Sequence, residues 1–315
     1  MTDRLGIAVE VGGGHATCAL VDGSGVLDKT LVDGVSTSLA RTLETVEAVV
    51  RELLAAAGVV PKDCIGISVA FCGIVDPGSC RVVATPQGKF EDASELDLAG
   101  WSRDAFGLQL RLENDARQAL VGEHWAGAAR GFQDVALITL GTGIGGAAMV
   151  DGRLLASRNH QAGVIGGHIP VNLDGRACRC GGSGCAEAEA STWALPSICA
   201  DWGGFAESSL AREEWIDYGT LFRHYDAGDA VAAAVLERSY DVWATLAVTL
   251  IHAYDPEVLV LGGAVMRRGE EVLPRIRARV HDRAWTPGRR VRIDASALGD
   301  DAPLYGAIPL LGLAA

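Results

Sequence analysis

A glycine-rich pattern that occurs twice constrains the fold of this chain more than any other feature. Residues 8–23 read AVEVGGGHATCALVDG and residues 137–152 read LITLGTGIGGAAMVDG, an offset of 129 positions. Each copy is an apolar run, a glycine-rich turn, a second apolar run and a Val-Asp-Gly turn, which predicts two antiparallel strands joined by a tight loop. Because the copies share the order of their elements, we interpret them as a duplication. We therefore expect two related lobes, each opening with a hairpin.

The segments around the hairpins alternate between helix and strand patterns. Apolar residues at helical spacing predict a helix over residues 38–57, with Ser38 as its N-cap and Gly58 then Pro61 at its end. Strands are predicted at residues 65–69, 108–112 and 258–261, helices at 230–253 and 269–280, and an irregular, partly helical insertion at 200–228. This alternation in both halves indicates an α/β fold.

Length and composition set the domain number and the class of protein. A chain of 315 residues exceeds the usual size of one domain. We place the first lobe at residues 1–115 and the second at 116–301, with a C-terminal helix at about 302–315 that packs back on the first lobe. The net charge of −13 disfavours nucleic acid as a partner.

Targeting signals and cysteine usage predict the compartment. No apolar run reaches the roughly 18 residues that span a bilayer, and no signal peptide precedes the first strand-like segment. Eight cysteines, three of them in one cluster, fit a reducing compartment better than a disulfide scaffold. We expect a soluble cytoplasmic protein with no membrane partner.

Three cysteines and one histidine lie within residues 168–187. His168, Cys178, Cys180 and Cys185 can complete a tetrahedral Zn²⁺ site of the Cys₃His type. Disulfide pairing is the alternative, but it would leave one cysteine unpaired, and Cys178 and Cys180 are too close in sequence for an easy bridge. Four protein ligands leave no position for a reacting water, so the predicted zinc is structural.

The glycine loops are candidate nucleotide-binding elements. Glycines after a strand let backbone N–H groups approach an anion, although glycine-rich hairpins also form as plain tight turns. A further glycine pair follows the strand at residues 258–261, where it would admit a flat nucleobase or only allow close strand–helix packing. The candidate residues are Gly12, Gly13, Gly14, Gly141, Thr142, Gly143, Gly262 and Gly263.

Two acidic positions have both a structural and a chemical interpretation. Asp115 lies where a strand gives way to a helix, so it can be an N-cap, a general base that takes a proton from a hydroxyl, or both, with Asn114 orienting the substrate. Glu187 follows a predicted zinc ligand, Cys185, after one residue. It is either a solvated loop residue or a side chain that the metal loop holds in place.

With these residues in place, the chain resembles the ROK family of repressors, open reading frames and sugar kinases over nearly its whole length. The resemblance rests on ENDA at 113–116, LGTGIGG at 140–146, the zinc signature ending in CAE at 185–187, LVLGG at 259–263 and DAPLYGA at 301–307. It implies an actin-like ATPase fold with two ribonuclease-H-like lobes around a central cleft. It also implies ATP and Mg²⁺, a sugar acceptor, and a homodimer or homotetramer.

The resemblance also implies roles for particular residues. Asp115 would be the base that accepts the proton of the sugar hydroxyl, most often the 6-hydroxyl. The implied sugar ligands are Gly73, Asn114, Asp115, His168 and Glu187. The first glycine loop with Glu10, together with Gly141, Thr142 and Gly143, would hold phosphates and Mg²⁺, and Gly262 and Gly263 would border adenosine.

Two segments depart from the pattern of similar sugar kinases. Where they carry Asp-x-Gly-Gly-Thr-Lys, this chain has a glutamate at Glu10, a glycine at Gly14 and a histidine at His15. Where they carry Gly-Glu-x-Gly-His, residues 163–168 read GVIGGH, without the glutamate that recognises hydroxyls near the anomeric carbon. Nearby residues that could replace it lie at 159–161. We therefore expect weak activity on glucose and better activity on a modified sugar.

Three functional hypotheses follow. The first is an ATP-dependent kinase acting on a hexose, an amino sugar or a sugar-like polyol. The second, prompted by the altered first loop, is a non-catalytic sugar sensor without a DNA-binding domain. The third is another actin-like enzyme, such as a carboxylate kinase or an ATPase.

Overall fold

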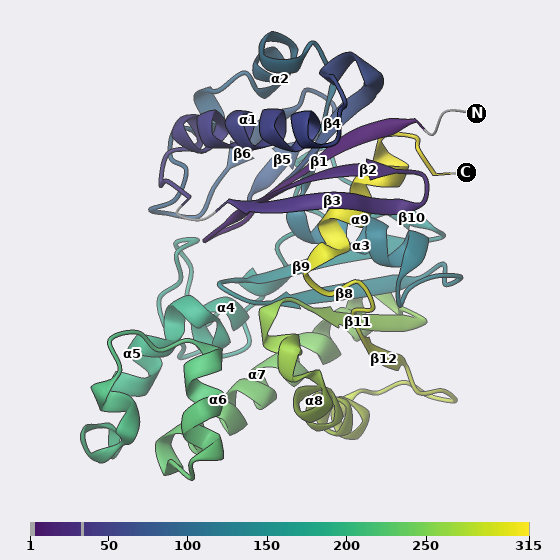
Figure 1. The fold of residues 1–315 in the computed structure, drawn as a ribbon. Coiled ribbons are helices and arrows are strands. Elements are labelled where there is room, and N and C mark those ends of the chain that lie inside the picture. Colours follow the sequence, from purple (N-terminus) through teal and green to yellow (C-terminus); the bar gives the residue numbers. More distant parts are fainter. Residues whose placement is uncertain (1–3, 33–34, 315) are drawn as a thin grey trace. The chain divides into compact units, whose positions relative to one another are not determined.

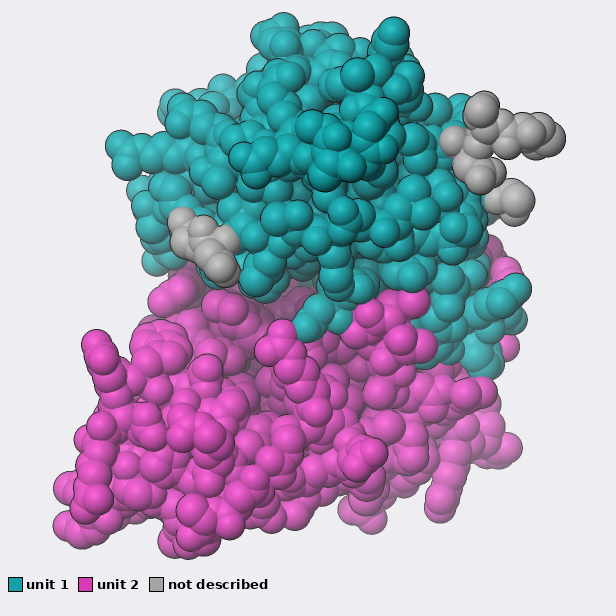
Figure 2. Space-filling model, viewed as in Figure 1, with its two compact units in different colours: residues 1–132, 153–164, 300–315 teal, residues 133–152, 165–299 magenta. Residues whose placement is uncertain are grey.

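The computed structural model describes residues 4–32 and 35–314, which form two compact units (Figure 2). Unit 1 comprises residues 1–132, 153–164 and 300–315, and unit 2 comprises residues 133–152 and 165–299. Figure 1 labels most of the helices and strands of both units. No helix within the described ranges combines the length and apolar character that a membrane crossing requires.

Strands and helices alternate along the chain. The strands are β1 (Leu5–Val11), β2 (Ala16–Asp22), β3 (Gly25–Val32), β4 (Cys64–Phe71), β5 (Ile74–Asp76), β6 (Arg81–Ala84), β7 (Leu110–Asn114), β8 (Val135–Leu140), β9 (Ile144–Val150), β10 (Arg153–Leu154), β11 (Val258–Gly262) and β12 (Arg292–Ala295). The α-helices are α1 (Leu39–Ala56), α2 (Leu98–Phe106), α3 (Asp115–Ala126), α4 (Ala186–Ala190), α5 (Leu195–Ala200), α6 (Tyr218–Asp226), α7 (Ala230–Tyr254), α8 (Gly269–Arg283) and α9 (Ala302–Leu310). Short 3₁₀ turns are η1 (Pro61–Asp63), η2 (Ala93–Glu95), η3 (Gly166–His168), η4 (Thr192–Ala194), η5 (Phe205–Glu207), η6 (Ser209–Arg212), η7 (Ala264–Arg268) and η8 (Gly299–Asp301).

The two units contain sheets of the same topology. In unit 1 the order is β3-β2-β1-β4-β7, with β1 antiparallel to β2 and parallel to β4. In unit 2 the strands follow the order β9-β8-β11-β12, with β8 antiparallel to β9 and parallel to β11. The two predicted hairpins are therefore confirmed, as are the α/β class and the repeated core of the fold.

In unit 1, helix α1 packs on the sheet and helix α9 packs against α3. Ser38 caps α1, as predicted, because its side chain accepts a hydrogen bond from the backbone N–H of Arg41. On α9, glycine is needed for close packing against α3: a Cβ on Gly306 would lie 1.9 Å from the backbone oxygen of Gln118, and one on Gly122 would lie 2.2 Å from that of Ala302. Large apolar side chains of α1 and the sheet complete the core.

This α3–α9 contact explains where the compact units divide. The sequence analysis placed a lobe boundary after residue 115, whereas α3 and residues up to 132 belong to unit 1. The interdigitated glycines of α3 and α9 join the C-terminal helix to the helix that follows Asp115. The C-terminal helix was predicted to pack on the first lobe, but its contact with α3 was not predicted.

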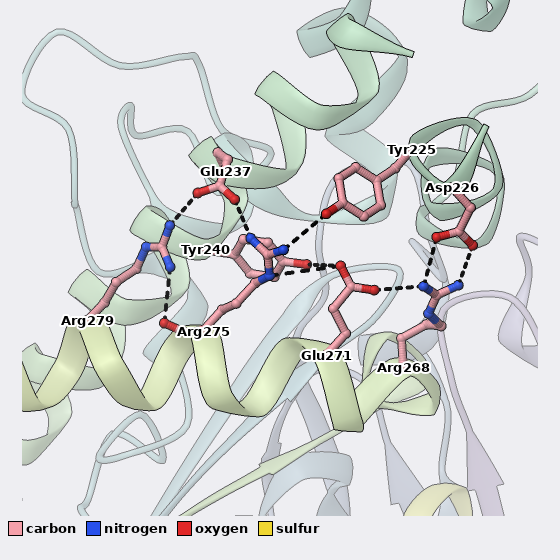
Figure 3. Close-up of polar contacts among 8 residues, drawn as sticks. All are labelled: Tyr225, Asp226, Glu237, Tyr240, Arg268, Glu271, Arg275 and Arg279. Atoms are coloured by element: carbon pink, nitrogen blue, oxygen red, sulfur yellow. Dashed lines mark hydrogen bonds and ion pairs between the residues drawn. The ribbon is translucent and has the colours of Figure 1, made fainter. Parts of the chain in front are cut away.

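Unit 2 is built around the long helix α7, which covers much of its core. Trp243 and Tyr240 on α7 are almost fully buried. A network of charged side chains links α7 to α6, η7 and α8, and it includes Tyr240, whose hydroxyl donates to Glu271 Oε1 at 3.4 Å (Figure 3). Arg268 contacts Asp226 at 2.7 Å, and Arg275 contacts Glu237 at 2.5 Å. Exposed ion pairs contribute little individually, so we assign this network to fixing helix orientation.

Candidate functional site

Asn114 and Asp115 lie at the junction between β7 and α3. Asn114 is the N-cap, because its Oδ1 accepts from the backbone N–H of Arg117 at 3.1 Å. Its Nδ2 donates to the Gly73 carbonyl at 3.1 Å and to Asp115 Oδ1 at 2.9 Å. The N-cap interpretation of Asp115 is thus wrong, since Asp115 is the first residue inside the helix. Its carboxylate is oriented by Asn114 and by the Ala116 N–H at 2.8 Å.

Glu10 lies in an acidic environment near the start of the first hairpin loop. Burial raises the pKa of its carboxyl to about 8, and the charges of Asp115, Asp300 and Asp301 add to this increase. Burial also raises the pKa of the Cys72 thiol, with Asp115 as the next contributor. Unit 1 therefore places the carboxylates of Asp115, Asp300 and Asp301 near Glu10, in a region where a bound cation would be favoured.

The first glycine loop has little support beyond its own backbone. The N–H of Gly12 donates to the His15 carbonyl at 2.9 Å, which closes the turn. Gly13, Gly14 and His15 are exposed. A Cβ on Gly14 would meet no atom within 4 Å. The loop thus has room for a larger residue and for a ligand.

The second glycine loop is braced from several sides within unit 2. The N–H of Gly141 donates to the Gly143 carbonyl at 3.0 Å. Two further carbonyls of the loop accept hydrogen bonds from η4. The Thr192 N–H donates to the Gly141 carbonyl, and the Trp193 N–H donates to the Thr142 carbonyl, both at 3.1 Å. This loop is therefore held in one shape before any ligand binds.

Glu187 supplies a further brace for the second loop. Its side chain is 8 % exposed, so the solvated interpretation is wrong. Glu187 Oε2 accepts from the Ile144 N–H at 2.9 Å, and Oε1 accepts from Trp193 Nε1 at 3.1 Å. A Cβ on Gly143 would lie only 2.5 Å from Glu187 Oε2, which explains glycine at that position.

The glycine pair after β11 has a packing role. Gly263 adopts φ of +85°, and a Cβ there would lie 2.5 Å from the Leu140 carbonyl oxygen. The close-packing interpretation is confirmed for Gly263. Gly262 ends the strand with no contact under 3.4 Å around its Cβ position, so it leaves space beside Ser296.

The predicted zinc ligands converge. The ligand atoms of His168, Cys178, Cys180 and Cys185 all lie within 4.8 Å of one another. Cys180 Sγ and Cys185 Sγ are 3.7 Å apart, and Cys178 Sγ and His168 Nδ1 are 3.5 Å apart. A tetrahedral zinc with Zn–S of about 2.3 Å and Zn–N of about 2.0 Å needs separations of about 3.8 and 3.5 Å. The residues fit Zn²⁺, with thiolates as soft ligands.

A small pocket in unit 1 borders Asn114 and was not predicted. Its volume is about 50 Å³. At its base, Arg117 Nε donates to Glu113 Oε1 at 2.8 Å, a buried ion pair whose i,i+4 spacing is visible in the sequence. The lining residues are Val75, Pro77, Glu113, Asn114, Arg117, Ala156, Ser157, His160 and Val164. They come from three separate segments, so no local pattern would reveal the pocket.

Comparison with known proteins now identifies the class. The ROK family model matches residues 6–312, and the chain belongs to this family. The structure has the actin-like ATPase fold of that family, with a Cys/His cluster that could hold zinc.

Particular relatives include both enzymes and regulators. The glucokinase of Thermotoga maritima is 31 % identical over 255 residues, covering 78 % of this chain and 80 % of the relative. The xylose repressor of Bacillus spizizenii is 25 % identical, covering 78 % of this chain and 60 % of the repressor. A ROK glucokinase from Streptomyces griseus, solved with glucose and AMPPNP, is 28 % identical with a TM-score of 0.83, covering 97 % of this chain and 98 % of the other.

Proposed function

We propose that this protein is an ATP-dependent sugar kinase. The observation that carries the proposal is the Asn114–Asp115 pair, in which a buried N-cap amide holds the carboxylate of Asp115 at 2.9 Å. Similarity to glucokinases along most of the chain supports the same class of reaction. The acceptor is a hexose, an amino sugar or a sugar-like polyol. The phosphoryl group goes to one of its hydroxyls, which is the 6-hydroxyl in a hexose.

In this proposal Asp115 acts as the general base. Its carboxylate takes the proton from the acceptor hydroxyl as that oxygen forms a bond to the γ-phosphorus of ATP. The bond between the γ-phosphorus and the β,γ-bridging oxygen breaks, and ADP leaves with the electron pair. Asn114 fixes the Asp115 carboxylate and, with the Gly73 segment, orients the sugar. Positioning of this kind supplies much of the rate in phosphoryl transfer.

The glycine loops and their neighbours would bind the nucleotide. Backbone N–H groups of Gly12–Gly14 and Gly141–Gly143 would contact phosphates, and the turn at Gly262 and Gly263 would border adenosine. Glu10 offers the hard oxygen ligand that Mg²⁺ prefers. When bound, Mg²⁺ supplies charge neutralisation for the phosphates.

The metal loop of unit 2 has a structural role in this proposal. Zinc on the His168 and cysteine side chains would fix the loop that leads into α4 and Glu187. We propose that His168 and Glu187 bind sugar hydroxyls. Glu187 already accepts a hydrogen bond from the Ile144 N–H of the second hairpin. A sugar hydroxyl would therefore share the Glu187 carboxylate with this N–H or replace it. The working assembly is a homodimer or homotetramer.

Replacement of Asp115 by asparagine tests the proposal. We expect Asp115→Asn to lower sugar-dependent ATP turnover by at least about a hundredfold, because the base is lost while the side-chain shape is kept. A coupled assay of ADP release measures this, with the exposed Asp104→Asn as the matched control. Turnover in Asp115→Asn within a few-fold of the unmodified protein would remove Asp115 from the reaction.

A second candidate function is a non-catalytic sugar sensor. It is favoured by the xylose repressors among the relatives and by the first loop, in which Glu10, Gly14 and His15 depart from the pattern of similar kinases. Titration calorimetry with ATP–Mg²⁺ separates the two. A kinase binds the nucleotide with measurable heat, whereas a sensor of this kind binds sugar alone.

A further inference from the structure

Trp193, in the turn η4, contacts three parts of unit 2. Its Nε1 donates to Glu187 Oε1 at 3.1 Å. Its backbone N–H donates to the Thr142 carbonyl in the second glycine loop, also at 3.1 Å. The guanidinium of Arg179 lies over its ring, 4.4 Å from the centroid. One residue therefore joins a candidate sugar ligand, a candidate phosphate loop and the loop that carries the Cys/His cluster.

The indole ring of Trp193 is held in place by its packing. The ring is partly buried and packs against the cluster formed by Cys178, Cys185 and Ala188. Arg179 follows Cys178 in the chain and covers the ring with its guanidinium, a cation–π contact. The direction in which Nε1 donates is therefore set by the loop of the Cys/His cluster.

The carboxylate of Glu187 keeps part of its hydrogen-bonding capacity for a ligand. Its Oε1 accepts from Trp193, and its Oε2 accepts from the Ile144 N–H at 2.9 Å. An ionised carboxylate has about four lone-pair positions, so about two remain beyond these two donors. These positions suit groups that donate hydrogen bonds, as sugar hydroxyls do.

The indole N–H of Trp193 fixes what the backbone alone leaves loose. The Ile144 N–H holds only one oxygen of Glu187, about which the carboxylate can turn. A second donor on the other oxygen fixes the plane of the carboxylate. Hydrogen bonds to a charged acceptor are stronger than those between neutral groups. Because a preorganised group binds its ligand with less loss of freedom, this donor should raise the affinity for sugar.

We infer that Trp193 is a positioning residue for the sugar, and that it acts by fixing the Glu187 carboxylate beside the second glycine loop. This inference rests on the sugar kinase function and on the role of Glu187 proposed above. It assigns sugar affinity, and not nucleotide affinity, to the Trp193 side chain. The contact with Thr142 is made by the backbone, so it survives a change of side chain.

Replacement of Trp193 by phenylalanine separates these two contacts. Trp193→Phe keeps a ring and the backbone N–H but removes Nε1. We expect KM for the sugar to rise about fivefold or more, because a hydrogen bond to a charged group is lost, and KM for ATP to stay within about twofold. The sugar is the best substrate of the unmodified protein among glucose, mannose, glucosamine and N-acetylglucosamine. An unchanged KM for sugar, or equal rises for sugar and ATP, overturns the inference.

A matched control and a double-mutant cycle show whether Trp193 acts through Glu187. Trp215 is 57 % exposed, and Trp215→Phe repeats the chemical change with no expected effect on either KM. In a Glu187→Ala protein the acceptor of the indole N–H is gone. There we expect Trp193→Phe to change kcat/KM for the sugar by less than about twofold. The full fivefold effect in that background overturns the inference.

A tryptophan isostere keeps the test decisive if Trp193→Phe does not fold. Benzothienylalanine has the shape of tryptophan, with sulfur in place of the ring N–H. Incorporated at position 193, it preserves the packing of the ring and removes the donor. We expect the same rise in KM for the sugar. A KM equal to that of the unmodified protein overturns the inference.

Tryptophan fluorescence measures the contact without turnover. Each of the four sugars that binds should change the emission of the unmodified protein, because Nε1 of Trp193 donates to the carboxylate that gains hydroxyl partners. The change should be lost in Trp193→Phe and kept in Trp215→Phe. A change that Trp193→Phe keeps in full, or no change on binding, overturns the inference. A sugar that changes the emission but is not phosphorylated contradicts the kinase function alone, and binding of none of the four contradicts both.

Discussion

The two glycine loops begin from one sequence pattern but are supported in different ways. The loop at residues 12–14 closes only on itself, through the Gly12–His15 hydrogen bond, and leaves Gly14 with no neighbour within 4 Å of its Cβ position. The loop at residues 141–143 is braced by η4 and by the buried carboxylate of Glu187. The hairpin is common to both units, whereas the bracing contacts from η4 and Glu187 are made, among the described residues, with the second loop.

The surroundings of the two loops differ in the same way. In unit 2, the brace comes from Glu187, which follows the Cys/His cluster on α4, so the second loop is connected through this helix to the predicted metal site. In unit 1, the neighbours of the hairpin are carboxylates, and the pKa of Glu10 is raised to about 8. The first loop therefore adjoins buried acidic side chains, whereas the second is held by hydrogen bonds from η4 and Glu187.

Among the changes that test this difference between the units, loss of the predicted metal should lower thermal stability the most. We expect Cys180→Ser to bind no zinc and to lower Tm by at least about 5 °C, because a structural zinc contributes directly to folding. Elemental mass spectrometry and calorimetric melting measure the two effects. Cys80→Ser, in unit 1, serves as the control and should retain about one zinc per chain. A Cys180→Ser protein that melts like the unmodified chain would contradict a structural metal.

A matched pair of glycine substitutions should lower Tm by different amounts in the two loops. Gly143→Ala would place a Cβ 2.5 Å from Glu187 Oε2, whereas Gly14→Ala would place one in open space. We expect Gly143→Ala to lower Tm by about 3 °C or more, since overpacking a tight site costs about 1–3 kcal/mol. Gly14→Ala should change Tm by about 1 °C or less. Equal losses in thermal melting would show that the two loops are equally constrained.

The acidic environment of the first loop should produce a smaller, pH-dependent effect. Burial and nearby carboxylates raise the pKa of Glu10 from 4.5 in the unfolded chain to about 8 in the fold. The folded state then binds more protons than the unfolded state, so the contribution of Glu10 to stability is complete below about pH 4.5 and is lost as pH rises to about 8.

Chemical denaturation across this pH range without Mg²⁺ measures the effect. The free energy of unfolding should fall with rising pH in the unmodified protein and fall less steeply in Glu10→Gln, which cannot ionise. The exposed Glu44→Gln is the control and should keep the original slope. If Glu10→Gln and the unmodified protein show the same slope, Glu10 does not ionise in this range.

The features that could be predicted from sequence are those with a local physical cause. Ser38 marks the start of α1 because a hydroxyl at an N-cap satisfies a free backbone N–H. The hairpins follow from alternating strands around glycine turns. The convergence of Cys178, Cys180 and Cys185 follows from their spacing within one loop, since thiolates so close in sequence need little further help to meet.

The features that were missed depend on partners far away in sequence. One interpretation made Asp115 the N-cap, but the cap is Asn114, because the backbone conformation at the end of β7 decides which side chain faces the free N–H groups. Strand β3 was not predicted, and α3 was not identified as a partner of the C-terminal helix, since nothing local identifies either contact.

The sequence by itself determined the α/β class, the two hairpins, the family and the four residues of the Cys/His cluster. Each of these depends on residue type and short-range spacing, which the chain carries in every conformation. Only the tertiary structure decided that Glu187 is buried against Ile144 and Trp193, and that segments 75–77, 113–117 and 156–164 enclose a neutral pocket. Burial and charge pairing between distant segments are set by packing, and packing exists only once the chain has folded.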